Sequence, residues 1–296
     1  MLGDLHVHTR CSDGSYTVEE ALRLAKARGL SYVSFTDHDT LRQNEEASAL
    51  AGGLGIRYIP GIEISGRNPL TGRKVHILGY YCRAGAESIS RLCVPLLEER
   101  DALTRESVKF LASRGWPVSL EEVLEATDHP AILYKQHVMV LLVAKGLASE
   151  VYGTEYRRIY GAGGEFGRDI AYADPFRAIA AVREAGGIPV LAHPGQYDSW
   201  DIVEGLVEQG LAGIEFYHES HAERDYQRVL AIVRRHPSLI LTGGSDDHGR
   251  FGSIHTIGEI RAPFGCLERL EAAGRLEAAG RTAGAGRIDR INQNLA

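Results

Sequence analysis

Histidine and carboxylate residues occur in this sequence in short groups whose spacing suits metal binding. His6 and His8 are separated by one residue, so on an extended strand both imidazoles point to the same side. Asp246 and His248 follow an apolar stretch near the other end of the chain. Imidazole and carboxylate ligands are typical of catalytic Mn, Fe and Zn sites. One such pair alone is weak evidence for a metal.

Further candidates lie in other short polar segments. Asp13 lies in Ser-Asp-Gly, which is typical of a turn whose Asp bonds its own backbone. His38 lies between two aspartates, one of which could instead cap a helix. Glu63 has isoleucine on both sides and is expected to be buried, where a carboxylate needs a partner such as a cation. His76 and His193 lie in apolar stretches, and His76 alone could be a hydrogen-bonded core histidine.

These residues adjoin apolar segments that we expect to be strands, at residues 2–8, 30–36, 56–64, 75–80, 188–192, 212–217 and 239–243. Helices are expected between them, at residues 17–28, 41–51, 175–185, 200–209 and 221–235. Thr17 and Glu20 have the spacing of a capping box. The strand–helix alternation predicts a parallel sheet in an α/β protein, and about seven units favour a closed barrel.

The placement of the polar residues is not explained by packing. Packing would scatter them along the strands, whereas here they follow six successive strand ends, which a barrel collects on one face. No cysteine belongs to the set, which favours an open catalytic site over a structural zinc site. We therefore expect two to three divalent cations, with nine candidate metal ligands: His6, His8, Asp13, His38, Glu63, His76, His193, Asp246 and His248.

Residues 85–170 interrupt the strand–helix pattern. We expect helices at 88–113, 120–126 and 136–145 and then a tyrosine-rich turn to Tyr160. An insertion on the reactive face of a barrel could close over a ligand as a lid. The predicted organisation is a discontinuous barrel of residues 1–84 and 171–265, a helical insert of 85–170, and a C-terminal tail of 266–296. The tail repeats Leu-Glu-Ala-Ala-Gly-Arg twice, as a glycine-broken helix or a loose end, and no function is assigned to it.

Composition limits the class of protein. The chain has 296 residues, 44% of them hydrophobic, and a net charge of −6, which is typical of a globular protein. No apolar run of about 18 residues occurs, and the start of the chain lacks a signal-peptide pattern, so no membrane partner is expected. The four scattered cysteines predict a cytoplasmic location. The acidic balance disfavours a long nucleic acid as partner, and the oligomeric state is left open.

Eight motifs along the chain resemble those of the PHP (polymerase and histidinol phosphatase) family. They occur in family order at Asp4–Thr9, Ser12–Gly14, Thr36–Thr40, Pro60–Ser65, Val75–Tyr80, Leu191–Gly195, Gly213–Glu215 and Gly244–Gly249. The subgroup that the chain resembles is that of stand-alone metal-dependent phosphoesterases with a helical insert. The resemblance implies a distorted (β/α)7 barrel of the TIM type, with a small helical insert.

The resemblance also implies how the ligands divide. One metal would be held by His6, His8, Glu63 and Asp246. Glu63 would bridge to a second metal, bound also by His76 and His193. A third site, often the weakest, would use Asp13, His38 and His248. The catalytic residues implied are His6, His8, Glu63, Asp246 and His248, while Asp37 and Asp39 would support the ligands.

The implied activity is that of a phosphoric ester hydrolase acting on small phosphorylated metabolites. These substrates would be a phosphomonoester, a nucleoside 3′,5′-bisphosphate or a small cyclic phosphate. The implied nucleophile is a metal-bound hydroxide. Mn is the metal expected first, and Fe or Zn would also suit the ligands. Lys135 stands where the subgroup usually has Arg, which replaces a bidentate fork with a point charge. Asp247 stands where an aromatic residue is usual. The candidate substrate contacts are Lys135, His137, Arg157, Arg158 and His221; the first four could instead lie on a solvated helix face.

Three alternatives are compatible with these motifs. A 5′–3′ exonuclease on short RNA or DNA is disfavoured because no basic stripe with interleaved aromatic residues is present. A non-catalytic metal-binding partner module is disfavoured because such a module would not need the complete set of ligands that the sequence carries. Amide hydrolysis is chemically feasible, but the motifs match the phosphoesterase branch.

Overall fold

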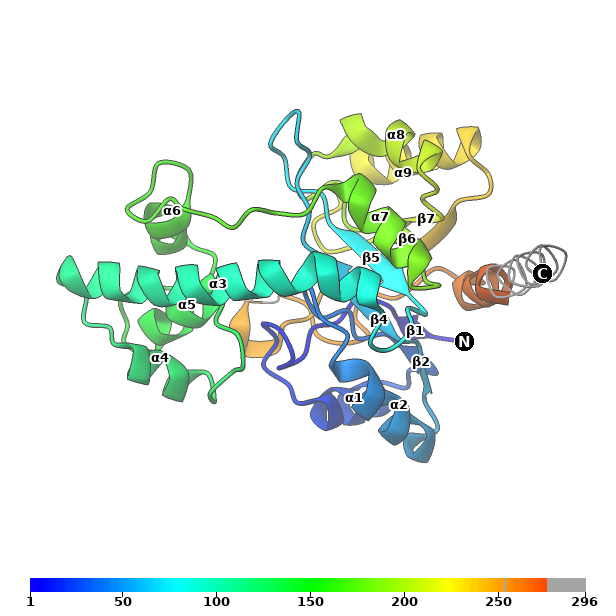
Figure 1. Ribbon diagram of the computed structural model, residues 1–296. Coiled ribbons are helices and arrows are strands. Elements are labelled where there is room, and N and C mark those ends of the chain that lie inside the picture. Colours follow the sequence, from blue (N-terminus) through cyan, green and yellow to red (C-terminus); the bar gives the residue numbers. More distant parts are fainter. Residues whose placement is uncertain (253, 276–296) are drawn as a thin grey trace, which may run out of the picture.

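The computed structural model describes residues 1–252 and 254–275, and the structural statements below concern those residues. The second copy of the Leu-Glu-Ala-Ala-Gly-Arg repeat, at 276–281, lies outside them. No described helix combines the length and apolar character that crossing a membrane requires. The chain is a mixed α/β protein with two sheets, flanking helices and a group of helices that extends to one side (Figure 1).

The first sheet is short and parallel. It has the order β1 (Gly3–Asp4), β2 (Tyr32–Val33) and β3 (Arg57–Tyr58). The second sheet has five strands in chain order: β4 (Gly61–Ile64), β5 (Ile77–Tyr80), β6 (Ile188–Leu191), β7 (Gly213–Tyr217) and β8 (Ile240–Gly243). The seven predicted strands are therefore all present, with the segment 56–64 divided into β3 and β4.

The prediction of an all-parallel sheet is wrong at β5. This strand is antiparallel to both of its neighbours, β4 and β6. The connection from β4 to β5 contains no helix, and its two arms approach each other at the antiparallel bridge between Arg67 and Lys74. A parallel neighbour requires a crossover, usually helical, whereas a hairpin reverses the chain. We call residues 65–76 the β4–β5 hairpin.

Backbone contacts outside the named strands join the two sheets. Isolated parallel bridges pair Val7 with Asp247 and His38 with Glu63. The amide of His8 also donates to the carbonyl of Asp247 at 2.9 Å. These contacts bring the segments that follow β1 and β8 together, although the strands of the described residues form two sheets and not one closed barrel.

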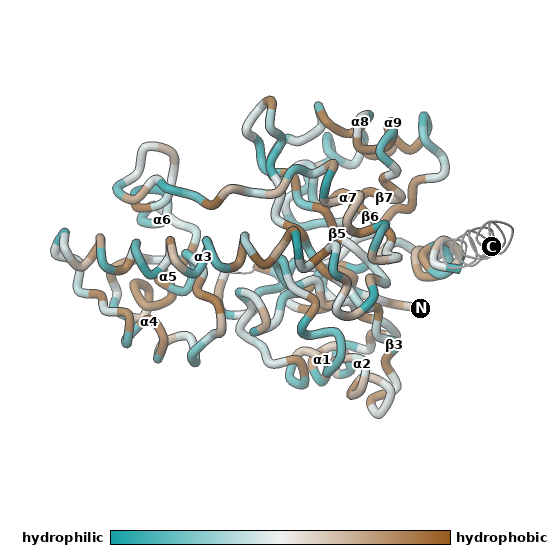
Figure 2. The backbone as a smooth tube through the Cα atoms, viewed as in Figure 1, coloured by the Kyte–Doolittle hydropathy of each residue, from teal (hydrophilic) through white to brown (hydrophobic). Residues whose placement is uncertain are grey.

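Amphipathic helices cover the sheets. They are α1 (Val18–Ala27), α2 (Gln43–Ala51), α7 (Pro175–Glu184), α8 (Val203–Glu208) and α9 (Glu223–Arg235), with short 3-10 turns at Gly52–Leu54, Trp200–Ile202 and Gly249–Phe251. In Figure 2, α8 and α9 carry both hydrophobic and hydrophilic residues, as expected for helices with one face on a core. The predicted capping box is present, since the Glu20 amide donates to the Thr17 hydroxyl and the Thr17 amide to the Glu20 carboxylate.

A second group of helices extends away from the sheets (Figure 1). It comprises α3 (Glu87–Ser113), α4 (Leu120–Ala126), α5 (Lys135–Ala144) and α6 (Thr154–Tyr160). The expected turn before Tyr160 is thus the helix α6. Side chains between Val108 and Phe166 form their own hydrophobic cluster, separate from those around the sheets. We call residues 87–160 the helical arm.

The described part of the tail is helical and packed. Residues 266–275 are helical, and Cys266, Leu267 and Leu270 are buried in the cluster that contains Leu5 and Tyr80. The first copy of the repeat therefore contributes Leu270 to the core. The tail was expected to be either a glycine-broken helix or a loose end, and residues 266–275 fit the helix.

Candidate metal centre

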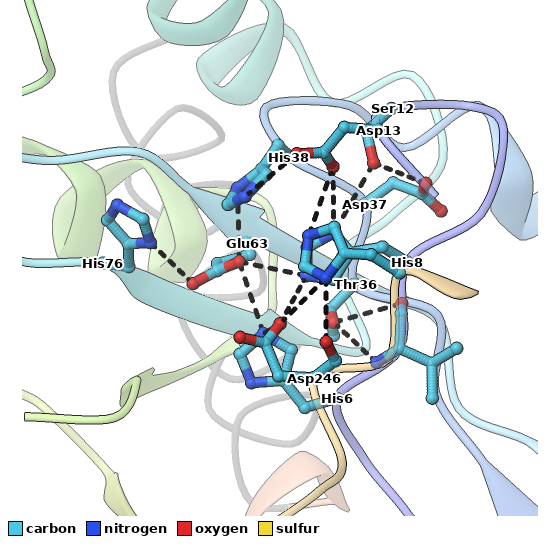
Figure 3. Close-up of polar contacts among 12 residues, drawn as sticks. His6, His8, Ser12, Asp13, Thr36, Asp37, His38, Glu63, His76 and Asp246 are labelled. Carbon is cyan, nitrogen blue, oxygen red and sulfur yellow. Dashed lines mark hydrogen bonds and ion pairs between the residues drawn. The ribbon is translucent and has the colours of Figure 1, made fainter. Parts of the chain in front are cut away.

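The predicted ligands lie at one end of the two sheets. They follow β1, β2, β6 and β8, lie within β4, or, in the case of His76, immediately precede β5. Because β5 runs antiparallel to its neighbours, its first residue lies at the same end as the last residues of β4 and β6. Figure 3 shows His6, His8, Asp13, His38 and Glu63 pointing toward one another from these different elements.

Glu63 contacts more of these imidazoles than any other carboxylate shown in Figure 3. Its Oε1 atom lies 2.8 Å from Nδ1 of His76 and 2.8 Å from Nε2 of His193. Its Oε2 atom lies 3.2–3.3 Å from nitrogen atoms of three further histidines, His6, His8 and His38. A carboxylate with an oxygen toward each of two histidine groups is placed to bridge two cations.

Four groups of side chains have possible ligand atoms within 4.8 Å of one another. They are His6, His8, Glu63 and Asp246; His38, Glu63 and His76; His8, Asp13, His38 and His248; and His6, His193 and His218. The first group is the implied first site, and the third adds His8 to the implied third site. The structure also groups His38 with Glu63, and it brings in His218, which was not predicted as a ligand.

The donor set fits divalent cations. In the part of the chain that is described, the facing atoms His6 Nε2, His8 Nε2, His38 Nδ1 and Glu63 Oε2 are buried and have no hydrogen-bond partner. Leaving buried polar atoms without hydrogen bonds is costly, so such atoms are normally satisfied by a ligand or ion. Imidazole nitrogens and carboxylate oxygens converging in this way match the ligand preferences of Mn, Fe and Zn.

Protonation in the cluster is determined by burial and by mutual contacts. Burial lowers the pKa of His193 to about 4, despite its hydrogen bond with Glu63, so this imidazole is neutral and able to coordinate. Burial raises the pKa of Glu63, but the imidazoles of His38, His76 and His6 outweigh it and hold that pKa well below its usual value. The carboxylate is therefore ionised.

Buried carboxylates orient the ligands from behind. Nδ1 of His6 lies 3.1 Å from Glu215 Oε1, while Glu215 Oε2 accepts the backbone N–H of His193 at 2.8 Å. Asp37 accepts hydrogen bonds from the amide of Thr9 at 2.8 Å and the hydroxyl of Ser12 at 2.7 Å. The Asp37 contacts fix the turn that carries Asp13, next to Ser12 in sequence. Such contacts behind a ligand fix its orientation and tautomer.

The backbone is also constrained here. Asp39 has a φ of 59° and Asp246 a φ of 54°, in the left-handed region that non-glycine residues rarely adopt. Asp39 is held by the Ser65 amide at 2.8 Å and by Nη2 of Arg100 at 2.9 Å. Asp4 accepts both the amide and the hydroxyl of Ser245, which ties the start of the chain to the segment carrying Asp246. Strained residues held by several contacts are typical of functional sites.

The metal centre opens into a cavity of about 800 Å³ between the sheets and the helical arm. The ligands Asp13, His38, Glu63, His76 and His193 lie on its wall. The opposite parts of the wall come from the arm and from the segment before α7, and include Arg100, Lys135, Tyr156, Asp169 and Tyr172. This volume is in the range of pockets that enclose a whole small molecule.

Of the predicted substrate contacts, Lys135 lies on the cavity wall, where its ammonium is 2.9 Å from Asp169. His137 is buried beside the cavity lining, and its Nδ1 accepts the amide of Tyr134 at 3.1 Å. His221 is also buried, with Nδ1 2.8 Å from the Phe216 carbonyl. Neither His137 nor His221 is among the described residues that line the cavity.

Arg157 and Arg158 are exposed on α6 and do not line the cavity. Arg158 pairs with Glu165 at 2.8 Å. The structure thus brings only Lys135 of the five predicted contacts to the cavity. Residues that the sequence did not single out, Lys74, Arg100 and four tyrosines among them, line it instead. The chain has 13 tyrosines but only 7 phenylalanines. This excess of aromatic rings with a hydroxyl was the one compositional signal for a polar, aromatic cavity wall.

The geometry defines a mixed α/β protein with clustered histidine and carboxylate side chains, able to hold metal ions, on the wall of a cavity. Residues 4–142 match the PHP domain family. The chain is 42% identical, over 87% of its length and 98% of the relative, to a phosphoribosyl 1,2-cyclic phosphate 1,2-diphosphodiesterase from Eggerthella lenta. It is 29% identical to a 3′,5′-nucleoside bisphosphate phosphatase from Chromobacterium violaceum, over 83% of this chain and 86% of that one. The chain belongs to the PHP family.

Solved structures agree with this assignment. A metal-dependent phosphoesterase structure from Bifidobacterium adolescentis has a TM-score of 0.83 and 27% identity, covering 92% of this chain and 96% of that one. An amidohydrolase from Chromobacterium violaceum, solved with sulfate and without metal, has a TM-score of 0.81 at 27% identity, with the same coverage. The predicted family membership is confirmed.

Proposed function

We propose that this protein is a metal-dependent hydrolase of P–O ester bonds in small phosphorylated metabolites, with a cyclic phosphate or a bisphosphate as its substrate. The predicted class, phosphoric ester hydrolase, is confirmed by the relatives. The observation that carries the proposal is the position of Glu63 among five imidazoles on the wall of a cavity. The 42% identical relative favours a small cyclic phosphate as the first candidate.

Divalent cations bound at this centre would lower the pKa of water and neutralise charge on phosphoryl oxygens. His6, His8, Glu63 and Asp246 would hold one ion, and Glu63 with His76 and His193 a second. Asp13, His38 and His248 would hold a third ion, which would be the most weakly bound of the three. We propose Mn first, with Fe or Zn also compatible with these donors.

The other roles in this proposed mechanism fall to side chains of the protein. Glu215 fixes the orientation of His6 through Nδ1, which leaves Nε2 toward the centre. Lys135 on the cavity wall supplies a positive charge for phosphoryl oxygens, where most transition-state stabilisation in phosphoryl transfer arises. Residues of the helical arm, Arg100 and Tyr156 among them, form part of the cavity wall opposite the centre.

The domain organisation is part of this proposal. We propose a distorted (β/α)7 barrel of residues 1–84 and 171–265, a lid of 85–170 and a tail of 266–296. The bridges from Val7 to Asp247 and from His38 to Glu63 support closure of the sheets into a barrel. The separate hydrophobic cluster of the arm supports the lid. A cytoplasmic location stays a prediction.

A 5′–3′ exonuclease is the second candidate, because a relative from Haemophilus influenzae named 5′-3′ exoribonuclease is 30% identical over 85% of this chain. A non-catalytic module is disfavoured because all predicted ligands are present and face one another.

Phosphorus NMR of the Mn-loaded protein separates the candidates. The panel holds a ribose 1,2-cyclic phosphate, an adenosine 3′,5′-bisphosphate, a 5′-monophosphate, histidinol phosphate and a short RNA. We expect metal-dependent conversion of a small ester. Cleavage of the RNA alone would establish the exonuclease, and no conversion with metal bound would refute both. NMR also detects ring opening, which releases no free phosphate.

A further inference from the structure

Glu219 is a carboxylate on the cavity wall that the metal centre does not use. It lies in the turn between β7 and α9, directly after His218, and its half-buried side chain lines the cavity. Glu219 belongs to none of the four groups of possible metal ligands that the described residues form. Its carboxylate therefore remains available for a contact with the substrate.

This carboxylate has no partner among the residues that the structure describes. Its Oε2 atom is enclosed by the protein and accepts no hydrogen bond, and it forms no ion pair with a described Lys, Arg or His side chain. An enclosed carboxylate oxygen without a hydrogen-bond donor is costly. A donor group on a bound substrate would remove this cost.

The charges in the cavity select the kind of donor. Glu219 interacts electrostatically with the carboxylate of Asp246, so this side of the cavity is unfavourable for a second anionic group of the substrate. A substrate ammonium would be repelled by the divalent cations of the proposed metal centre and by Lys74 and Lys135, which line the same cavity. A hydroxyl group is neutral and donates a hydrogen bond without either penalty.

Glu219 is also close to the position of the reacting ester. Nε2 of its sequence neighbour His218 lies 3.2 Å from Oδ2 of Asp246, a ligand of the first proposed ion. Glu219 interacts electrostatically with His248 of the third proposed site as well. A hydroxyl bound by Glu219 would therefore lie beside the ester that the metal centre hydrolyses. Acidic residues bind ribose hydroxyls in this way in dinucleotide-binding proteins.

We propose that Glu219 accepts a hydrogen bond from a substrate hydroxyl on the carbon next to the reacting ester, and that it thereby determines a preference for sugar phosphates over their deoxy analogues. This inference rests on the proposed function and adds a specificity-determining residue to it. The contact positions the substrate, and no bond is formed or broken at Glu219. A deoxy analogue leaves the enclosed carboxylate unpaired, which is the physical basis of the discrimination.

The test compares ribose 1,2-cyclic phosphate with its 3-deoxy analogue, which lacks the hydroxyl next to the C2 ester. We would measure kcat/KM of the Mn-loaded protein for both compounds. The wild type should prefer the hydroxylated compound by about 10- to 100-fold, as expected for a hydrogen bond to a charged group, and Glu219→Ala should bring the ratio close to one.

Two further variants complete this experiment. Glu219→Gln keeps an acceptor oxygen and should retain part of the preference. Glu208→Ala, at the exposed end of α8, is the matched control and should leave the ratio unchanged.

Three results would overturn the inference. A wild type without a preference has no contact with this hydroxyl. An unchanged ratio in Glu219→Ala assigns the preference to another residue. Loss of Mn from Glu219→Ala, measured by elemental analysis, would show that Glu219 supports the metal centre instead.

Calorimetric titration of the metal-free protein with the same two compounds is the readout that does not depend on activity. Tighter binding of the hydroxylated compound, lost in Glu219→Ala, supports the role of Glu219 even if neither compound is hydrolysed, in which case the proposed function alone fails. Equal affinities of the wild type for the two compounds would refute the hydroxyl contact.

Discussion

Gln136, in the first turn of α5, donates a side-chain hydrogen bond to Oδ2 of Asp13, in the turn that follows β1. Both residues are buried. This bond connects the helical arm directly to the metal centre, so the arm is more than a cover over the cavity. It restrains one of the carboxylates that would hold the third ion.

The first prediction concerns this bond. Gln136→Leu should weaken Mn binding at the third site by about 10- to 100-fold, the usual effect of losing a contact behind a ligand. Stepwise Mn titration by calorimetry would resolve the site, with exposed Gln227→Leu on α9 as control. Identical titrations of Gln136→Leu and the wild type would show that the bond does not restrain Asp13.

The second prediction concerns Glu63. Glu63→Gln keeps the shape but removes the charge that faces both histidine groups, so metal content should fall at two sites together and turnover by about a thousandfold or more. Elemental analysis and the NMR assay would measure this, and circular dichroism would check the fold. Glu204→Gln, exposed on α8 beside Arg235, is the control. Loss of a single ion with turnover retained would contradict a bridging role.

The third prediction concerns pH. Burial lowers the pKa of His137 to about 4, whereas an unfolded histidine has a pKa near 6.5. Between these two pH values the unfolded chain binds more protons than the folded chain. The contribution of His137 to the free energy of unfolding is therefore complete above about pH 6.5 and is lost as the pH falls toward 4. The total loss should be about 3 kcal/mol.

Urea unfolding at several pH values would measure this effect. In His137→Gln, whose amide can still accept the Tyr134 N–H, the free energy of unfolding should fall less steeply below pH 6.5. Parallel curves for the wild type and the variant would show that His137 does not contribute.

The fourth prediction concerns the helical arm. Leu142 is fully buried in the cluster of the arm, so Leu142→Ala should cost about 2–5 kcal/mol. If the arm is a separate unit, amide hydrogen exchange should accelerate in α4 and α5 but not in β4–β8. Leu206→Ala, in the cluster around the sheets, should show the reverse pattern. Uniform acceleration in both variants would show one cooperative unit.

Sequence was sufficient to predict which histidine and carboxylate side chains converge, because their signal is local. Glu63 between two isoleucines had to be buried, and buried carboxylates need partners. The direction of β5 was missed because hydrophobic pattern carries no information on strand direction. Asn68, Pro69 and Gly72 in the connection were turn signals that favoured a hairpin.

The cavity wall was harder to predict. Arg157 and Arg158 and the buried Ile159 and Tyr160 are adjacent in sequence, and the packing of α6 in the arm decides which of them faces solvent. Lys74 was not predicted because its neighbours Tyr172 and Tyr197 are about a hundred residues away in sequence. Contacts of that kind depend on the fold as a whole.

The left-handed backbone at Asp246 restricts which residues evolution and mutagenesis can place there. With φ at 54°, most side chains would add about 1–2 kcal/mol of backbone strain, whereas asparagine and glycine tolerate this region. An alanine at this position therefore perturbs the chain path as well as the ligand. Asparagine isolates the loss of charge, and a comparison of the two separates the chemical contribution of the carboxylate from the conformational one.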